Sequence, residues 1–251
     1  MPHLISNRRR VYKLTKGRED LRAEFRWESL NAVLYKIGGL TFVAGSVFFY
    51  PGLSAYIDLG AFLFFFGSLL YLLVTTHDLI EVTKNRDGNN EARRQYNLEL
   101  IAAFAYQTGT FLFVVGSLLF LSWFEQIFWG AWCFIVGSFQ FVVGASVNVI
   151  QVPEKGPKSS LQLVNLTAVT FVTGSVLFLV ASIPYLWTIP NDQTVDTIDR
   201  FLASQYLAGS ILFLVGGLTN YLRAYIVIRK GIAQRGPSQH EASAGPLSGV
   251  P

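Results

Sequence analysis

Apolar residues in this chain are gathered into six long runs that are separated by short polar segments. The runs cover residues 31–49, 60–80, 100–121, 127–150, 161–183 and 203–228. Each is close to the ~20 residues that an α-helix needs to cross ~30 Å of hydrocarbon. A backbone in lipid must satisfy its own hydrogen bonds, and the runs are too long and too uniformly apolar for membrane strands. The pattern therefore predicts an all-α fold, a polytopic membrane protein with six transmembrane helices.

Short connections group these helices into pairs. Turn signals at Tyr50-Pro51-Gly52 and around 123–129 join neighbouring runs, and so short a connection forces the two helices to be antiparallel. Longer polar linkers lie between one pair and the next. We therefore expect three tandem hairpins, at residues 31–83, 97–152 and 160–230. The third is expected to contain a long outer loop that ends in the acidic stretch 191–199.

The two ends of the chain are polar. Residues 1–30 are basic, and within them an apolar stripe predicts a short amphipathic helix at about 18–30 that lies on the cytoplasmic membrane surface. Residues 233–251 are rich in Gly, Pro and Ser and are expected to form a disordered cytoplasmic tail.

A Gly-Ser pair recurs once in every apolar run. The glycines are Gly45, Gly67, Gly116, Gly137, Gly174 and Gly209. Three residues before them stand Phe42, Phe64, Phe113, Phe134, Phe171 and Tyr206, and four after them stand Phe49, Tyr71, Phe120, Phe141, Phe178 and Phe213. All twelve positions are aromatic, although aromatic residues make up only 15% of the chain. The chain therefore contains an internal repeat.

Small residues also recur at seven-residue spacing, which returns a helix to the same face. Lipid tails are as apolar as leucine, so membrane helices associate through close packing, and small residues let their backbones approach. We interpret the six glycines as helix-packing positions beside aromatic ridges, in preference to an aromatic ligand-binding box. The serine after each glycine is expected to donate a hydrogen bond to the carbonyl four residues back.

The repeated Phe-x-x-Gly-Ser helices, preceded by Trp27-Glu28-Ser29-Leu30-Asn31-Ala32 and Tyr35, resemble the YrhK-like membrane domain family. One domain of that family resembles one hairpin here, so the resemblance implies three tandem copies. The third copy departs from the pattern because it has the long loop and lacks the Trp-Glu start. The resemblance implies a small multi-pass membrane protein and supplies no catalytic residues.

Charge is distributed unequally between the connections. Assigning them alternately to two sides of a membrane puts 18 of the 20 Lys and Arg residues on one side. The positive-inside rule then places both termini in the cytoplasm, and the plasma membrane is the favoured location. Beside six membrane helices, this basic surface indicates anionic lipid headgroups as partners, and nucleic acid is not expected.

Few polar side chains lie within the apolar runs, and these are candidate polar contacts: Lys36, Asp78, Gln140, Asn148 and Asn220. Asp78, Asn148 and Asn220 share one repeat position, eleven residues after the glycine. One interpretation is a cytoplasm-facing polar vestibule, with Gln140 as a substrate contact near the bilayer centre. The favoured interpretation is hydrogen bonding between helices.

No catalytic or metal-binding motif is present, and the single cysteine, Cys133, has no partner for a disulfide. We therefore expect neither an enzyme nor a cofactor. The leading hypothesis is a structural or accessory membrane protein that associates with lipids, with copies of itself or with other membrane proteins. The alternative is a small channel or transporter, since internal repeats are frequent in transporters.

Overall fold

The computed structural model describes residues 21–84, 90–150, 158–187 and 192–233, and every regular element in these ranges is helical. The elements are α2 (Leu21–Val47), η1 (Pro51–Tyr56), α3 (Ile57–Lys84), α4 (Asn90–Leu119), α5 (Ile127–Ile150), α6 (Lys158–Ser182), η2 (Ile183–Leu186) and α7 (Asp192–Ala233). Six segments are long and apolar enough to cross a membrane. The predictions of an all-α chain and of six long apolar helices are confirmed for these ranges.

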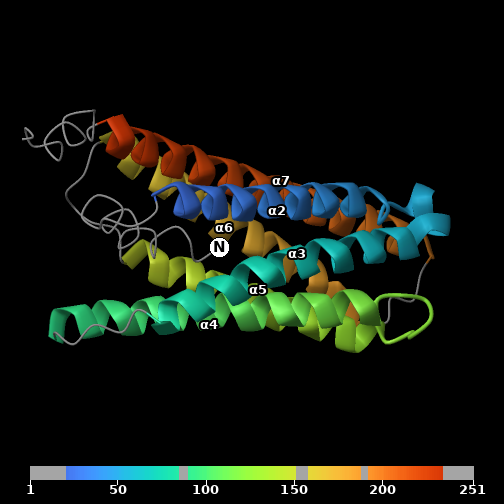
Figure 1. Ribbon diagram of the computed structural model, residues 1–251. Coiled ribbons are helices and arrows are strands. Elements are labelled where there is room, and N and C mark those ends of the chain that lie inside the picture. Colours follow the sequence, from blue (N-terminus) through green and yellow to red (C-terminus); the bar gives the residue numbers. More distant parts are fainter. Residues whose placement is uncertain (1–20, 85–89, 151–157, 188–191, 234–251) are drawn as a thin grey trace, which may run out of the picture.

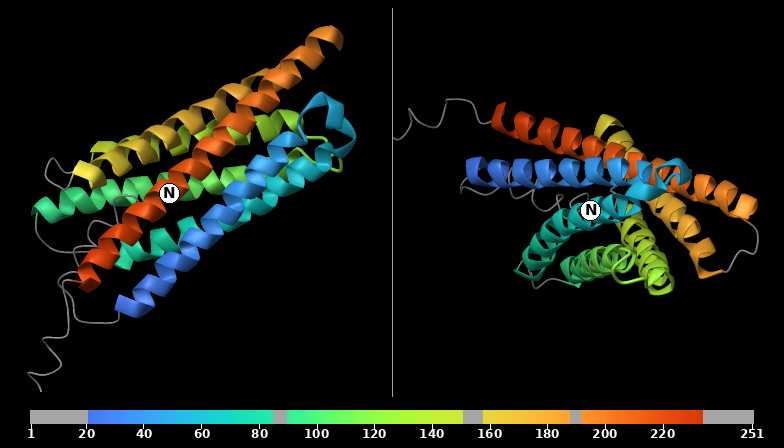
Figure 2. Two further views of the ribbon diagram at one scale, coloured as in Figure 1. Left: turned by 90° about the horizontal axis from the view of Figure 1, so that it is seen from above. Right: turned by 90° about the vertical axis from the view of Figure 1, so that its right-hand side faces the viewer.

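The six long helices form a closed ring in chain order. Each packs against the helix before it and the helix after it, and α7 packs against α2. Figure 1 and Figure 2 show α2 and α7 lying side by side, although they stand near opposite ends of the chain. The end of the ring with η1, the turn between α4 and α5, and η2 is called the turn end. The opposite end, where α3 stops and α4 starts, is called the linker end.

Backbones approach closely between α2 and α3. A Cβ atom added to Gly45 would lie 2.9 Å from the carbonyl oxygen of Gly60, and one added to Gly38 would lie 3.1 Å from that of Gly67. The two contacts pair an early residue of one helix with a late residue of the other, so the helices are antiparallel. In this register the Gly-Ser glycine of α2, Gly45, faces Gly60 of α3. Gly60 stands seven residues before Gly67, the Gly-Ser glycine of α3.

The same register recurs between α4 and α5. A Cβ atom added to Gly116 would lie 3.2 Å from the oxygen of Gly130, and one added to Gly109 would lie 2.9 Å from that of Gly137. Gly130 again stands seven residues before the Gly-Ser glycine. The first two helix pairs therefore share both their sequence pattern and their contact register.

The pair of α6 and α7 is shifted by one heptad. Here the two Gly-Ser glycines face each other, since a Cβ atom added to Gly174 would lie 3.1 Å from the oxygen of Gly209. The residue seven before Gly209 is Leu202, whose bulk would occupy the contact if this pair used the register of the others. Instead α7 uses Gly209 and Gly216, and a Cβ atom added to Gly216 would lie 2.6 Å from Oγ1 of Thr170. Seven residues of helix correspond to about 10 Å of slide.

Aromatic side chains fill the interior of the ring. All twelve aromatic positions of the repeat belong to this core or pack against it. Phe178 of α6 is fully buried, and its ring centroid lies 5.9 Å from that of Phe64 on α3 and 5.6 Å from that of Phe113 on α4. It also lies 6.5 Å from Phe42 on α2. Because these contacts cross the ring, they tie its opposite sides together.

The serines of the repeat divide into two groups. Ser46, Ser117 and Ser175, in the first helix of each pair, each bond the carbonyl four residues back at 2.7 Å, as predicted. The prediction is wrong for the second helices. Ser210 shares a 3.1 Å hydrogen bond with Ser46 across the α2–α7 contact, and the buried hydroxyls of Ser68 and Ser138 have no partner among the described residues.

Two predicted boundaries are wrong. Residues 21–30 are not a separate surface helix, because α2 runs without a break from Leu21 to Val47; residues 1–20 lie outside the described ranges. The long loop of the third pair is also shorter than predicted, because α7 already starts at Asp192 within the acidic stretch. Acidic side chains are favourable in the first turns of a helix, and Asp196 pairs with Arg200 one turn later at 3.0 Å. The predicted tail, 234–251, is not described.

Candidate functional site

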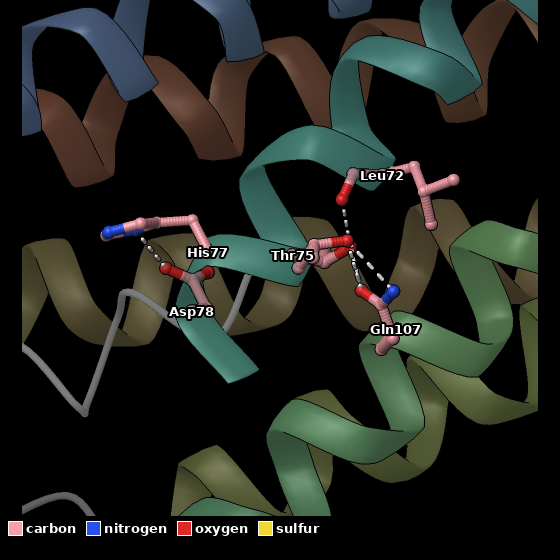
Figure 3. A network of polar contacts seen from close by, with 6 residues as sticks. Leu72, Thr75, His77, Asp78 and Gln107 are labelled. Atoms are coloured by element: carbon pink, nitrogen blue, oxygen red, sulfur yellow. Dashed lines mark hydrogen bonds and ion pairs between the residues drawn. The ribbon is translucent and has the colours of Figure 1, made fainter. Parts of the chain in front are cut away.

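A polar cluster joins α3 to α4 on the linker-end side of the aromatic core (Figure 3). Thr75 Oγ1 donates to Gln107 Oε1 at 2.8 Å, and Gln107 Nε2 donates to Thr76 Oγ1 at 2.9 Å. Thr75 also lies 3.2 Å from the carbonyl oxygen of Leu72. The amide of Gln107 thus both accepts and donates a hydrogen bond within the protein. We call Thr75, Thr76 and Gln107 the Thr–Gln cluster.

His77 and Asp78, which directly follow Thr76 on α3, form a close pair of opposite chemical type. His77 Nδ1 lies 4.0 Å from Asp78 Oδ1, which is close enough for electrostatic attraction but too long for a hydrogen bond. The Asp78 side chain is fully buried, whereas that of His77 is 27% exposed. Figure 3 shows the pair pointing away from the Thr–Gln cluster, so the two groups are separate features of α3.

Asn148 and Asn220, which share the repeat position of Asp78, have different surroundings. Asn148 is buried, and its Nδ2 donates to the hydroxyl of Tyr106 on α4 at 3.1 Å. The Oδ1 atom of Asn220 is buried without a hydrogen-bond partner among the described residues. One repeat position therefore serves different contacts in different helix pairs.

The remaining predicted contacts are single interactions. The ammonium of Lys36 lies 3.9 Å from the ring centroid of Tyr221, a cation–π contact between α2 and α7. Gln140 is half-buried on α5. The six repeat glycines are buried at helix contacts, as described above.

A tyrosine pair caps the aromatic core near the same end. The rings of Tyr35 and Tyr71 are stacked with centroids 4.4 Å apart, and the Tyr35 hydroxyl donates to the carbonyl of Phe213 on α7 at 3.3 Å. Tyr35 therefore joins α2, α3 and α7. These tyrosines and Tyr106 add hydroxyl groups to the linker-end side of the aromatic core.

Sequence reasoning missed the Thr–Gln cluster. The position near the bilayer centre points to Gln140 as the amide of interest, yet Gln107, nine residues before Gly116, also lies in an apolar run. The signal that identifies it is the pairing of an isolated amide with two adjacent hydroxyls on the preceding helix, Thr75-Thr76. Once α3 and α4 are taken as neighbours, these three residues are expected to meet.

The chemistry available in this region is hydrogen bonding between helices. Within the described ranges, no three His, Cys, Asp or Glu side chains come together as a metal site would require. The hydroxyl and amide groups of the Thr–Gln cluster bond one another, and Asn148 bonds Tyr106. Such bonds between membrane helices typically contribute ~0.6 kcal/mol each, so these contacts help to align α3, α4 and α5.

The family model of the YrhK-like protein matches residues 25–82 and 96–152. These stretches are the first two helix pairs, so the resemblance is confirmed there as two tandem matches. The pair of α6 and α7 lies outside both matched stretches, and its standing as a third copy stays a prediction. No curated protein and no solved structure matches the chain.

Proposed function

From the two YrhK-like matches, we propose that this chain is a polytopic membrane protein of three tandem hairpins that acts through contacts, without catalysing a reaction. In this proposal it serves a structural or accessory role in the membrane, and the plasma membrane is the favoured location. Both termini face the cytoplasm, because nearly all Lys and Arg residues then lie on that side.

The observation that carries this proposal is the filled centre of the ring. Phe178 contacts aromatic rings from α2, α3 and α4 at 5.6 to 6.5 Å, and its side chain is fully buried. A transporter keeps its substrate site near the bilayer midplane, typically between discontinuous helices. Here the middle of the ring is packed with phenylalanine, and the polar groups of the Thr–Gln cluster bond each other. This arrangement favours the accessory role over the channel or transporter alternative.

The proposed partners are anionic lipid headgroups on the cytoplasmic side, together with copies of this chain or other membrane proteins. Basic residues near a membrane surface attract anionic lipids with about 1 kcal/mol each. Large apolar side chains also cover the outside of the ring, such as Leu40, Phe104 and Val169, which are 56%, 59% and 61% exposed. Such a surface is suited to lipid tails and to other membrane helices.

Flux measurements on purified protein in sealed liposomes separate the two functions. We expect ions and small polar solutes to cross protein-containing vesicles no faster than empty ones, and an ionophore added at the end verifies that the vesicles were sealed. Flux that rises with the amount of protein would reject the accessory role. Native mass spectrometry from nanodiscs of mixed lipids examines the partners, and retention of anionic over neutral lipid is the expected result.

A further inference from the structure

A small cavity lies inside the ring at the turn end, with a volume of ≈ 60 Å³. Its walls are mainly aromatic: Phe49, Phe64, Phe120, Phe134, Tyr185 and Tyr206. Ile57 and Ile127, the first residues of α3 and α5, also line it and place it next to the ends of the helices. The cavity is therefore located at one end of the core.

The walls are held by contacts among the aromatic rings themselves. The centroids of Phe49 and Phe64 are 5.1 Å apart, and Phe120 lies 5.4 Å from both Phe134 and Tyr185. These separations fall within the range of favourable tilted and edge-to-face aromatic pairs. Since each ring is braced by another, the space between them is a formed cavity.

The heptad shift of the third pair accounts for the composition of the wall. Phe49 and Phe120 are the aromatic residues four after the glycine in α2 and α4, and the equivalent residue of α6 is Phe178. Phe178 instead packs deep in the core, and Tyr185, seven residues later, stands in the cavity wall. A one-heptad slide thus puts η2, and not α6, at this side of the cavity.

Two of the three hydroxyl groups in the wall have partners within the protein. The hydroxyl of Ser117, which lines the cavity, donates to the carbonyl of Phe113 at 2.7 Å. The hydroxyl of Tyr206 shares a 2.8 Å hydrogen bond with that of Ser182. A buried water needs two to four polar partners, and Tyr185 is the one other wall residue with a hydroxyl. The site is therefore unfavourable for water and favourable for an apolar group.

We propose that this cavity is a binding site for a small hydrocarbon group, supplied by a lipid chain or by an apolar solute dissolved in the bilayer. An apolar cavity of about 150 Å³ holds benzene, so ≈ 60 Å³ limits the occupant to a short alkyl group or a single xenon atom. Ile57 and Ile127 in the wall are each 48% exposed, so this side of the cavity reaches the outer surface of the ring, which lipid would cover if the ring spans a membrane. The site is an addition to the accessory role, and its binding test does not depend on that role.

Xenon is the probe for the test, with the full chain in nanodiscs and its alanine and isoleucine methyl groups labelled for NMR. We expect the methyl signals of Ile57, Ala61 and Ile127 to shift and then saturate as xenon pressure rises. The lipid-facing methyls of Ile37 and Ile101, which are 43% and 50% exposed, serve as controls. Their signals should shift linearly, since xenon merely dissolves in the lipid around them.

Filling the cavity should remove the saturating shift. Ala61 is 1% exposed and lines the site, so Ala61→Leu puts the added carbons into the space. If that variant does not fold, Ile127→Phe in the wall provides the same test from an exposed position. Linear shifts at all five methyls, or a saturating shift that survives in the filled variant, would overturn the proposal.

A second experiment, without xenon, distinguishes a lipid chain from a free apolar solute as the source of the hydrocarbon group. In nanodiscs with protonated lipid and deuterated protein, a nuclear Overhauser effect from lipid chains to the Ala61 methyl identifies a lipid group as occupant. Saturable xenon binding without that effect identifies a free apolar solute. An effect from water to the Ala61 methyl would show a hydrated cavity and contradict the proposed chemistry.

Discussion

Replacing Gly137 by leucine fills the closest backbone contact between α4 and α5. A Cβ atom at this position would lie 2.9 Å from the carbonyl oxygen of Gly109 and 2.8 Å from Cδ2 of Phe113. Phe113 is 1% exposed and packs against Phe134 at 4.6 Å, so its ring has little room to move. The Gly109 oxygen belongs to a helix backbone. To accept even one carbon, α4 and α5 must therefore separate.

The magnitude follows from two opposing effects. Overpacking a close interface costs about 1 to 3 kcal/mol, and leucine, with four side-chain carbons, falls at the upper end. Replacing a helical glycine by a good helix former returns about 1 kcal/mol, so alanine should be nearly neutral to mildly destabilising. In a chain of 251 residues, 1 kcal/mol shifts the melting temperature by roughly 2 to 4 °C. A net loss of about 2 kcal/mol for Gly137→Leu then lowers the melting temperature by roughly 4 to 8 °C.

Thermal unfolding in detergent measures this difference, and α5 itself offers a matched control. Ser146 is exposed on the same helix, so Ser146→Leu introduces the same side chain without pressing it against another helix. Gly137→Ser should lie between the parent and the leucine variant. If Gly137→Leu melts together with the parent and with Ser146→Leu, the glycine face does not carry the helix contact, and the packing account built on it must be abandoned.

Three further predictions concern the α6–α7 register, a strained turn and the orientation in the membrane. Leu202→Gly combined with Gly216→Leu should slide α7 by about one heptad toward the register of the other pairs, and an unchanged distance between spin labels on α6 and α7 would contradict the role of Leu202. Glu125 has a φ of 49°, a left-handed conformation that glycine adopts more easily, so Glu125→Gly should raise the melting temperature by a few degrees while Glu125→Ala should not. Tags at the termini and at 84–94 should be reached by antibodies only from the cytoplasm and a tag at 190–199 only from outside; cytoplasmic labelling of the last would reject the six-span topology.

The aromatic core could be predicted from the sequence because an aromatic residue occupies all twelve equivalent positions of the repeat. The positions three residues before and four residues after each glycine fall on adjacent faces of a helix. In the structure all twelve side chains lie in one core or pack against it. The number of long helices follows from the number and lengths of the apolar runs. The start of α7 at Asp192 could not be predicted in this way. Acidic residues at a helix start look like a loop when only hydropathy is considered, because the favourable helix dipole is not part of the pattern.

The contacts between helices were less predictable. A seven-residue spacing of small residues is compatible with several registers, so the pattern alone does not say whether Gly174 faces Leu202 or Gly209. The hydroxyl groups pose a similar problem, because Ser210 can bond its own helix or Ser46 on another, and the choice depends on which helices are neighbours. The Thr–Gln cluster likewise exists only because the ring brings α3 against α4.

The different register of α6 and α7 has a consequence for how a duplicated chain is able to diversify. Because small residues recur every seven positions, two packed helices are able to adopt several discrete registers. Each of these registers keeps small residues at the contact. One bulky residue in place of a small one, as at Leu202, excludes one position and selects the next. If the third pair is a copy of the first two, a single substitution at this position is therefore sufficient to make one pair of the ring differ in register from the other two.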